Sequence, residues 1–380
     1  MKTMIVVTHL LGTGHLSRAL TLARAFVAKG HDMLVASGGM PAPQLDHSDI
    51  QILQLPPLQS DGTNFTRLLD DTGLPADESY LSNRSEILNR AFAAFRPEIL
   101  ITELYPFGRR ILSTEFLSLL DTAKALLTPP TVLSSIRDIL APPSKPSKAT
   151  RADEIIARYY DAVLVHSDPQ TTQLDQSWPV SGKLAPFLHY TGYVAPPNAS
   201  THPDNTGTGE ILVSAGGGSV GDALFETAVQ AARLDPNQQW RLLVGGSNAK
   251  DRVAKYSQLA RGTRTIIEPA RSDFRQMLHG AAASVSMCGY NTALDLLQAG
   301  TPAVMIPFDA GNEVEQTLRA TSLASMPGLS VLSSVDLTPE MLNLHLQQVI
   351  NDGPRVDGGL NFDGAAQTVR LACDMAEARI

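Results

Sequence analysis

The sequence has 380 residues, of which 43% are apolar and 18% are charged, and its formal net charge is −8. This length suggests two domains or one large one, and the apolar content excludes wholesale disorder. The acidic balance argues against nucleic-acid binding, and two cysteines cannot form a disulfide framework. The apolar run at Met1–Leu11 is too short for a signal peptide or a membrane span. We therefore expect a cytoplasmic protein without a transmembrane segment, for which peripheral membrane contact stays open.

Short apolar runs alternate with amphipathic stretches along the first half of the chain. The predicted strands are Met4–Leu10, Asp32–Ser37, Ile50–Leu55, Glu98–Leu104, Thr131–Ile136 and Ala162–His166. The predicted helices are His15–Lys29, Ser85–Phe95, Arg109–Leu126 and Asp153–Tyr160. This alternation predicts βα units and a parallel sheet covered on both faces. Two polar segments, Pro56–Asn83 and Ala141–Ala149, interrupt it and are predicted as mobile surface loops.

The second half repeats the pattern after a polar stretch, Ala195–Gly209, whose composition is typical of a linker. The predicted strands are Ile211–Ala215, Arg241–Val244, Thr265–Ile267, Ser284–Met287 and Ala303–Ile306. The predicted helices are Asp222–Leu234, Asp251–Arg261, Asp273–Ala282, Asn291–Ala299, Glu313–Leu323, Pro339–Asn351 and Asp363–Arg379.

These patterns predict an α/β protein with two doubly wound, Rossmann-like parallel-sheet domains that face each other across a cleft. The first domain is expected over residues 1–195 and the second over 210–362, joined by a linker at 196–209. The last segment, 363–380, is expected to be a helix that can pack back on the first domain. In such sheets, ligands bind outside the carboxyl ends of the strands.

A glycine-rich turn, Gly216–Asp222, follows the first strand of the second domain and opens a helix. Backbone N–H groups at such a turn form a site for a phosphate or diphosphate. Gly216, Gly218 and Gly221 also have the G-x-G-x-x-G spacing. A dinucleotide fold then needs an acidic residue at the end of the next strand, but that strand ends Val244–Ser247, so NAD binding is disfavoured.

The same turn contains G-x-S-x-G through Gly217, Ser219 and Gly221, the pattern of a hydrolase nucleophile elbow. Acid and base partners exist further along at Asp273, His279 and His345, but no HGGG-type oxyanion segment is present. A hydrolase therefore stays open as a weaker alternative, as does a turn that needs glycine for packing only.

A second group of polar residues lies further along the chain, where two predicted strands end and the following helices begin. Gly289, Asn291 and Thr292 open a helix and can bind an anion there. Asp295 follows one turn later on the same side and can accept two hydrogen bonds from a vicinal diol such as a ribose. Glu315 and the neighbouring Gln316 open the next helix.

This second group resembles the donor-binding signature of GT-B glycosyltransferases, particularly family 28, whose members include the UDP-GlcNAc transferase of peptidoglycan synthesis. The turn Gly12–Arg18, with Gly30 and His31, is similar to that family's amino-terminal G-x-G-H turn. Four further sequence segments resemble a bacterial group of predicted glycosyltransferases without an assigned substrate. With them, the resemblance covers nearly the whole chain. They are His9–His15, Thr102–Arg110, Arg137–Leu140 and Tyr190–Tyr193.

The resemblance implies a donor site in the second domain. The diphosphate would contact Gly217, Gly218, Ser219, Gly289, Asn291 and Thr292, and the ribose would contact Asp295. The donor sugar would contact Asn312, Glu315 and Gln316, and the nucleotide base would contact Pro269, Ala270 and Arg271. Two departures stand out. The ribose ligand in the family is usually Glu, one methylene longer than Asp295, and Glu315-Gln316 replaces a pair of polar residues, which leaves the donor sugar open.

His15 fits a general base that removes the proton of an attacking acceptor hydroxyl. At a helix amino terminus the cationic form of His15 is disfavoured, so the imidazole stays neutral. The alternative is that His15 caps the turn or only forms a hydrogen bond with the donor phosphate. Glu103 and Asp138 follow strands at the same sheet edge and are alternative bases. Gly14 and Arg137 are expected on the acceptor side, where Arg137 contacts an anionic acceptor or pairs with Asp138.

Neither Asp-x-Asp nor His-Glu-x-x-His occurs in the sequence, so no metal and no cofactor are expected. The predicted reaction is a single displacement with inversion, in which helix termini and backbone N–H groups stabilise the leaving nucleoside diphosphate. Its partners are a nucleotide-sugar donor, UDP-linked by resemblance, and an unknown acceptor that is small or lipid-linked. Two further alternatives stay open: a UDP-sugar 2-epimerase of similar fold and a non-catalytic nucleotide-sugar binder.

Overall fold

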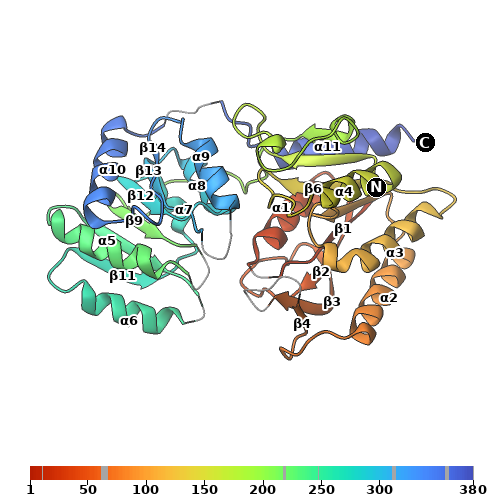
Figure 1. Ribbon diagram of the computed structural model, residues 1–380, viewed down its shortest axis with the longest axis horizontal. Coiled ribbons are helices and arrows are strands. Elements are labelled where there is room, and N and C mark those ends of the chain that lie inside the picture. The colour runs from red at the N-terminus through yellow and green to blue at the C-terminus, as the bar shows by residue number, and fades with distance from the viewer. Residues whose placement is uncertain are drawn as a thin grey trace. The chain divides into compact units, whose positions relative to one another are not determined.

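The computed structural model describes residues 1–10, 12–60, 67–216, 220–246, 248–309, 314–355 and 359–379. The chain divides into two compact units (Figure 1). Unit 1 consists of Met1–Ala195 together with Asn361–Ile380, and unit 2 consists of Pro196–Leu360. The predicted residues Gly217, Gly218, Ser219 and Asn312 lie outside the described ranges.

Unit 1 is built on an eight-stranded sheet in the order β4-β3-β2-β1-β5-β6-β7-β8. Its strands are β1 (Lys2–Val7), β2 (Asp32–Gly39), β3 (Gln51–Ser60), β4 (Leu68–Leu69), β5 (Ile99–Glu103), β6 (Thr131–Arg137), β7 (Ala162–His166) and β8 (Leu188–Tyr190). All neighbours are parallel except β3 and β4. Buried apolar runs such as Met4–Val7 in β1 are typical of a sheet covered on both faces.

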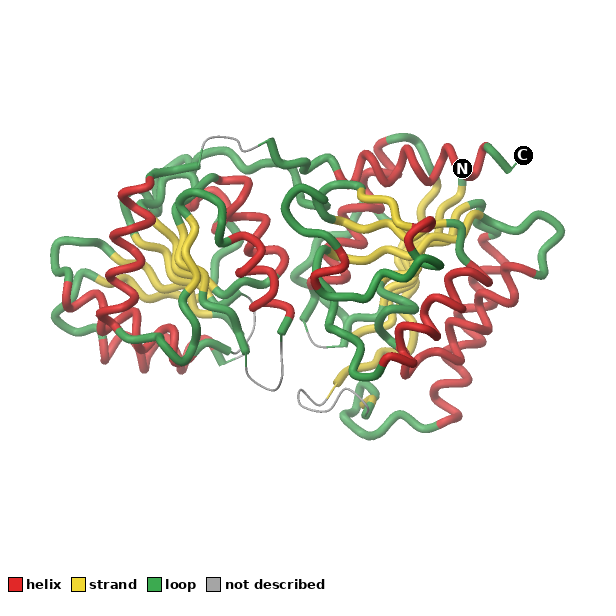
Figure 2. Tube along the Cα trace, turned by 45° about the horizontal axis from the view of Figure 1, so that its top comes forward, coloured by secondary structure: helices red, strands yellow, loops and turns green. Residues whose placement is uncertain are grey.

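Helices cover both faces of this sheet, as Figure 2 shows. They are α1 (Gly14–Ala28), α2 (Glu78–Phe95), α3 (Ser113–Lys124), α4 (Pro146–Tyr159) and α11 (Gly364–Glu377), with short 3-10 turns at Arg110–Leu112, Leu174–Gln176 and Ala185–Phe187. On one face, Leu20 and Phe26 of α1 form a core with Val369 and Ala372 of α11. The helices α2, α3 and α4 contribute to the core on the other face.

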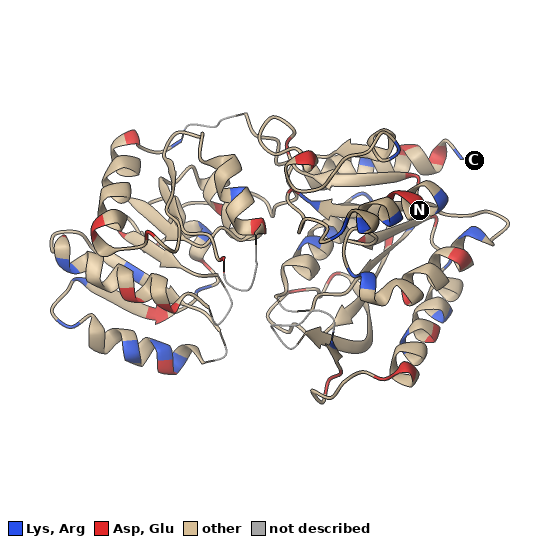
Figure 3. Cartoon of the chain, viewed as in Figure 1, with Lys and Arg blue, Asp and Glu red and all other residues tan. Residues whose placement is uncertain are grey.

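Unit 2 is built on a six-stranded parallel sheet in the order β11-β10-β9-β12-β13-β14. Its strands are β9 (Ile211–Ser214), β10 (Trp240–Val244), β11 (Thr265–Pro269), β12 (Ala283–Ser286), β13 (Ala303–Met305) and β14 (Leu329–Val331). Its helices are α5 (Asp222–Leu234), α6 (Ala249–Leu259), α7 (Phe274–Leu278), α8 (Tyr290–Ala299), α9 (Glu315–Leu323) and α10 (Pro339–Asp352). Charged residues gather mainly on helices and loops in both units (Figure 3).

The prediction of two doubly wound parallel-sheet domains is confirmed. In each unit the strand order reverses beside the first strand, between β1 and β5 in unit 1 and between β9 and β12 in unit 2. In doubly wound sheets, ligands bind at the carboxyl ends of the two strands between which the order reverses. This places the site in unit 1 at the ends of β1 and β5, and the site in unit 2 at the ends of β9 and β12.

Two predicted loops are shorter than expected, because helices begin inside them. The predicted loop Pro56–Asn83 contains the start of α2, where the Asp77 side chain accepts a hydrogen bond from the Tyr80 N–H at 2.7 Å. The predicted loop Ala141–Ala149 contains the start of α4, where Pro146 is the first helical residue. Both helix starts were missed because their first turns are polar, so only an N-cap Asp and an N1 Pro mark them. The first loop is shortened further by the end of β3 at Ser60 and by β4 at Leu68–Leu69.

Candidate functional site

The site in unit 1 centres on His15 and Glu103, which lie 88 positions apart in the sequence. His15 is the second residue of α1, which follows β1, and Glu103 is the last residue of the neighbouring β5. The Nδ1 atom of His15 lies 2.8 Å from Oε1 of Glu103. An ionised carboxylate can only accept, so His15 donates its Nδ1–H to Glu103. The other ring nitrogen, Nε2, is then left as an acceptor.

Glu103 is fully engaged by its neighbours. Arg18 of α1 forms an ion pair with Oε1, and the Ser135 hydroxyl of β6 donates to Oε2 at 2.7 Å. Burial alone would raise the pKa of Glu103, but Arg18, His15 and Ser135 together hold it at about 2. Glu103 therefore orients His15 as a permanent carboxylate, because both of its oxygens already accept hydrogen bonds.

His15 is the exposed end of this group, with 14% of its side chain accessible against 2% for Glu103. Burial lowers the pKa of His15 to about 3, an effect that Glu103 opposes and that the nearby Arg109 and Arg137 reinforce. The imidazole is therefore neutral across the physiological range, in the tautomer that can accept a proton at Nε2.

The other residues predicted for this side lie at the same sheet edge. Gly14 is the first residue of α1, and Arg137 ends β6. Asp138 is buried, with 2% of its surface exposed, and accepts a hydrogen bond from the Ile139 N–H at 2.7 Å. Arg109 comes from the loop after β5, has a φ of +56°, and donates its Nε–H to the carbonyl of Thr8 at 2.5 Å.

In unit 2, the glycine-rich turn between β9 and α5 is shaped by two residues with positive φ, Gly216 at +78° and Gly221 at +90°. A Cβ on Gly221 would lie 2.6 Å from the Cβ of Ala215, so only glycine fits there. Arg252 of α6, which the sequence analysis missed, ties this turn to the next one. It donates to the carbonyls of Val220 and Gly245 at 2.8 and 2.9 Å.

The second predicted anion site is the amino terminus of α8, directly after β12. Gly289 is its N-cap residue, and a Cβ on Gly289 would meet nothing within 4 Å, so the space beside this helix end is open. Asn291 is exposed and Thr292 half-buried in the first turn. Open space beside the first N–H groups of a helix is what a diphosphate requires.

Asp295 lies one turn further along α8 and is joined to Arg275 of α7. The Nε–H of Arg275 donates to Oδ1 of Asp295 at 2.9 Å, and the same guanidinium donates to the Gln298 side chain and the Pro197 carbonyl, each at 2.8 Å. Burial raises the pKa of Asp295 to about 6, although Arg275 opposes the shift. Arg275 had no sequence motif to mark it.

The residues predicted for the donor sugar and base lie at the ends of the neighbouring strands. Glu315 and Gln316 open α9, and Gln316 accepts a hydrogen bond from the Phe308 N–H at 3.1 Å. Pro269 ends β11, and the Ala270 N–H donates to the Val244 carbonyl at 2.9 Å.

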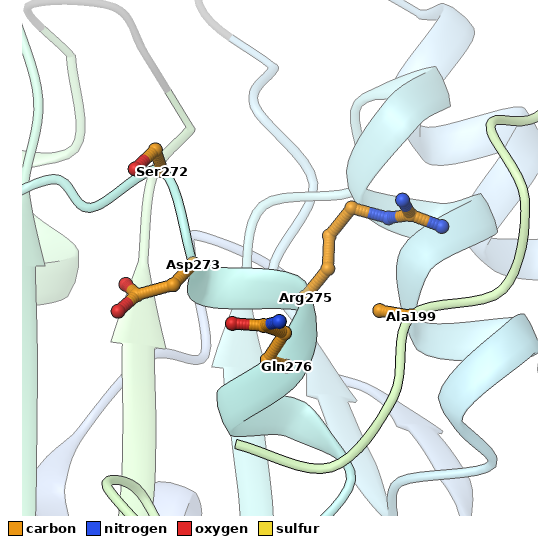
Figure 4. Close-up of a pocket in the computed structure, with 5 residues that line it drawn as sticks. All are labelled: Ala199, Ser272, Asp273, Arg275 and Gln276. Carbon is orange, nitrogen blue, oxygen red and sulfur yellow. The ribbon is translucent and has the colours of Figure 1, made fainter. Parts of the chain in front are cut away.

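Arg271 follows this strand end and forms two hydrogen bonds with Asp273, at 2.8 and 2.6 Å. A hollow beside these residues is lined by Ala199, Ser272, Asp273, Arg275 and Gln276 (Figure 4). One of its walls is the segment predicted as a linker, which contributes Ala199. This segment is also joined to unit 2 through His202, whose Nε2 lies 3.0 Å from Oδ2 of Asp273.

Across the described ranges, no three His, Cys, Asp or Glu side chains come together as a metal site would need. Among the same residues, no helix is both long enough and apolar enough to span a membrane.

Comparisons with known proteins agree with this geometry. Residues 211–357 match the Glycosyltransferase family 28 C-terminal domain. Over 169 residues the chain is 28% identical to the UDP-N-acetylglucosamine–N-acetylmuramyl-(pentapeptide) pyrophosphoryl-undecaprenol N-acetylglucosamine transferase of Brucella anthropi. That match covers 43% of this chain and 45% of the relative, so it spans less than half of either protein.

Solved structures extend the likeness to the whole chain. MurG of Acinetobacter baumannii superposes with a TM-score of 0.64 at 17% identity, over 99% of this chain and 100% of that one. The glycosyltransferase VinC, in complex with dTDP, superposes with a TM-score of 0.61 at 14% identity, over 100% of both chains. Two doubly wound parallel-sheet units with these neighbours define the GT-B fold. Within that fold, unit 2 matches the C-terminal domain of glycosyltransferase family 28, so the resemblance seen in the sequence is confirmed.

Proposed function

We propose that the protein is a metal-independent, inverting glycosyltransferase. It moves a hexose or N-acetylhexosamine from a UDP-sugar to an acceptor hydroxyl. The observation that carries this proposal is the His15–Glu103 pair at the end of the first sheet, in a chain whose other unit matches a family 28 domain.

The donor would bind at the carboxyl edge of the sheet in unit 2. The turn after β9 and the amino terminus of α8 both offer backbone N–H groups for the diphosphate, with Gly289 beside open space. Asp295 would accept hydrogen bonds from the two ribose hydroxyls while Arg275 holds its other side. The negative charge that develops on the leaving diphosphate would be stabilised by these helix termini, without a divalent metal.

His15 would act as the general base. Glu103 holds its Nδ1–H, so Nε2 can accept the proton of the acceptor hydroxyl as the oxygen attacks the anomeric carbon. A base with a pKa near 3 is weak, but an anionic ligand beside the imidazolium raises that pKa. Base strength would thus increase when the charged substrate is in place.

The acceptor and the location of the protein belong to the same proposal. The name of the Brucella relative states a pyrophosphoryl-undecaprenol acceptor, which favours a lipid-linked acceptor over a small molecule here. Such an acceptor would be reached from the cytoplasmic face, by peripheral contact with the membrane.

The donor site is tested by calorimetric titration of UDP, GDP, dTDP and ADP in EDTA. We expect selective binding of UDP and at least a tenfold weaker affinity in Asp295→Ala, because the ribose then loses its acceptor. The matched control is Asp235→Ala, an exposed carboxylate just past the end of α5. Equal binding of all four nucleotides, or UDP binding that Asp295→Ala leaves unchanged, would contradict the donor site.

The transfer step is tested with UDP-glucose and UDP-GlcNAc against a panel of lipid-linked and small acceptors. His15→Gln should lower kcat/KM by about 10²–10⁴-fold with UDP affinity unchanged, as expected for loss of a general base. His47→Gln, at an exposed histidine of the same unit, is the control. Conversion of the donor without any acceptor would instead identify a 2-epimerase, and binding without turnover a non-catalytic binder.

A further inference from the structure

A row of buried hydrogen bonds continues from Glu103 across the neighbouring strands of unit 1. The Ser135 hydroxyl of β6 contacts Glu103 Oε2 at 2.7 Å and His166 Nε2 at 2.9 Å. His166 ends β7, and its Nδ1 lies 2.8 Å from the hydroxyl of Thr191, just after β8. The row thus links four adjacent strands, from Thr191 after β8 through β7 and β6 to Glu103 of β5, and Glu103 contacts His15.

Proton donors and acceptors in this row can be arranged in one consistent way. Glu103 is ionised and only accepts, so Ser135 donates to it. The Ser135 oxygen then accepts the Nε2–H of His166. The Nδ1 of His166 is left as an acceptor 2.8 Å from the Thr191 hydroxyl, which also lies 3.0 Å from the Gly192 carbonyl. Burial and, to a lesser extent, Arg18 lower the pKa of His166 to about 3 against the opposing effect of Glu103, so the ring is neutral, which supports this arrangement.

Burial sets this row apart from ordinary polar packing. Ser135, His166 and Thr191 have no exposed surface, and Glu103 has 2%. Such groups are costly to bury unless every donor meets an acceptor. Only the His15 end is accessible to a ligand, with 14% of its side chain exposed. Any effect of the row on chemistry must therefore pass through His15.

We propose that Ser135, His166 and Thr191 are positioning residues that fix the tautomer of His15. They orient the Glu103 carboxylate so that one oxygen faces Ser135 and the other faces His15. Without them the carboxylate turns, and His15 no longer keeps its proton on Nδ1. The kinetic consequence of this inference rests on the proposed function, but its structural consequence does not.

The tautomer is tested by nitrogen-15 NMR of the histidine rings, with the His15 signals identified by their loss in His15→Gln. Wild-type His15 should show a single Nδ1–H tautomer at neutral pH. Ser135→Ala should give a mixture of tautomers. The matched control is Ser134→Ala, which removes an equally buried hydroxyl from the same strand, one that donates to the Tyr105 carbonyl at 2.8 Å instead.

A second pair of variants covers the case in which Ser135→Ala does not fold. Thr191→Val removes the hydroxyl at the end of the row and should give a mixture of His15 tautomers. Thr191→Ser keeps the hydroxyl and should show the single Nδ1–H tautomer of the wild type. An unchanged His15 tautomer in folded Ser135→Ala or folded Thr191→Val would overturn the inference. So would an equal change in Ser134→Ala.

Activity provides an independent readout. Ser135→Ala should lower kcat/KM for transfer about tenfold in the wild-type background and cause no further loss in His15→Gln, because both act through one imidazole. A further tenfold loss in the double variant would contradict the inference. A protein that transfers no sugar would refute the proposed function, while the NMR result would still decide the inference.

Discussion

Asp295 carries a charge where burial disfavours it, and this makes donor binding sensitive to pH. Its pKa is about 6 in the free protein, and a ribose diol can donate two hydrogen bonds only to the ionised carboxylate. The nucleotide complex should therefore have a lower Asp295 pKa than the free protein. By linkage, affinity is fully present above pH 6 and falls as pH drops through 6, approaching tenfold per pH unit.

The measurement is the dissociation constant of UDP by calorimetry between pH 5 and 7.5. Protonation of the nucleotide contributes its own slope, and Asp295→Asn reports that slope alone. The difference between wild type and variant isolates the carboxylate. Identical pH profiles for the two proteins would remove Asp295 from the ribose site.

At the scale of elements, α2 is held to unit 1 by an ion pair as well as by its apolar face. Arg84 of α2 is fully buried and donates to Glu115 of α3 at 2.8 and 3.1 Å, and to the carbonyl of Gly38 at 2.9 Å. Arg84→Met leaves Glu115 buried and unpaired, so we expect the free energy of unfolding to fall by ~3–5 kcal/mol in urea denaturation.

The double variant Arg84→Met/Glu115→Leu removes both charges and should regain part of that loss, because no unpaired carboxylate remains. If Arg84→Met alone unfolds at the wild-type urea concentration, α2 does not depend on this pair. Lys255→Met is a useful comparison, because Lys255 pairs with Glu226 at an exposed site and its loss should leave the urea midpoint close to that of the wild type.

The individual helices and strands show how much of the structure could be predicted from the sequence. The helix Asp222–Leu234 was predicted with the bounds it has, because its apolar periodicity is regular and its ends are marked. The strands β8 and β14 were missed because each has only three residues and most of them are half-buried, whereas the equally short β13 is fully buried and apolar. His15 and Glu103 were both candidates for the base, but their pairing depends on β1 lying beside β5, which no local pattern reveals.

Arg275 and His166 show a further limit of prediction. Neither belongs to a motif, and each acquires its partners only through tertiary contacts, with Asp295 of α8 in one case and Ser135 of β6 in the other. Residue types that converge from different strands can be predicted only once the strand order is known. The carboxyl edge of a doubly wound sheet was predictable as a location, but its hydrogen bonds were not.

At the scale of the whole molecule, the last helix completes a unit that began at the first residue. Ala372 of α11 is fully buried against the face that α1 covers. Ala372→Asp buries an unpaired carboxylate there, so unit 1 should lose ~3 kcal/mol of stability. Hydrogen exchange should speed up at Leu16–Phe26 and stay slow at Leu224–Val229 of unit 2.

The control for this prediction is Arg370→Asp, which changes charge on the exposed side of the same helix. It should leave exchange in both units close to wild type. Equal acceleration in both units by Ala372→Asp would mean that the two units unfold together rather than separately.

The discontinuity of unit 1 has a consequence for the nascent chain. A ribosome releases Met1–Ala195 first, and the whole of Pro196–Leu360 must be translated before α11 emerges. At ~5–20 residues per second this delay lasts roughly 10–30 s. During that time the core that α1 and α11 share on this face of the sheet lacks Val369 and Ala372 of α11. The growing polypeptide thus exposes apolar surface on this face that the finished protein buries.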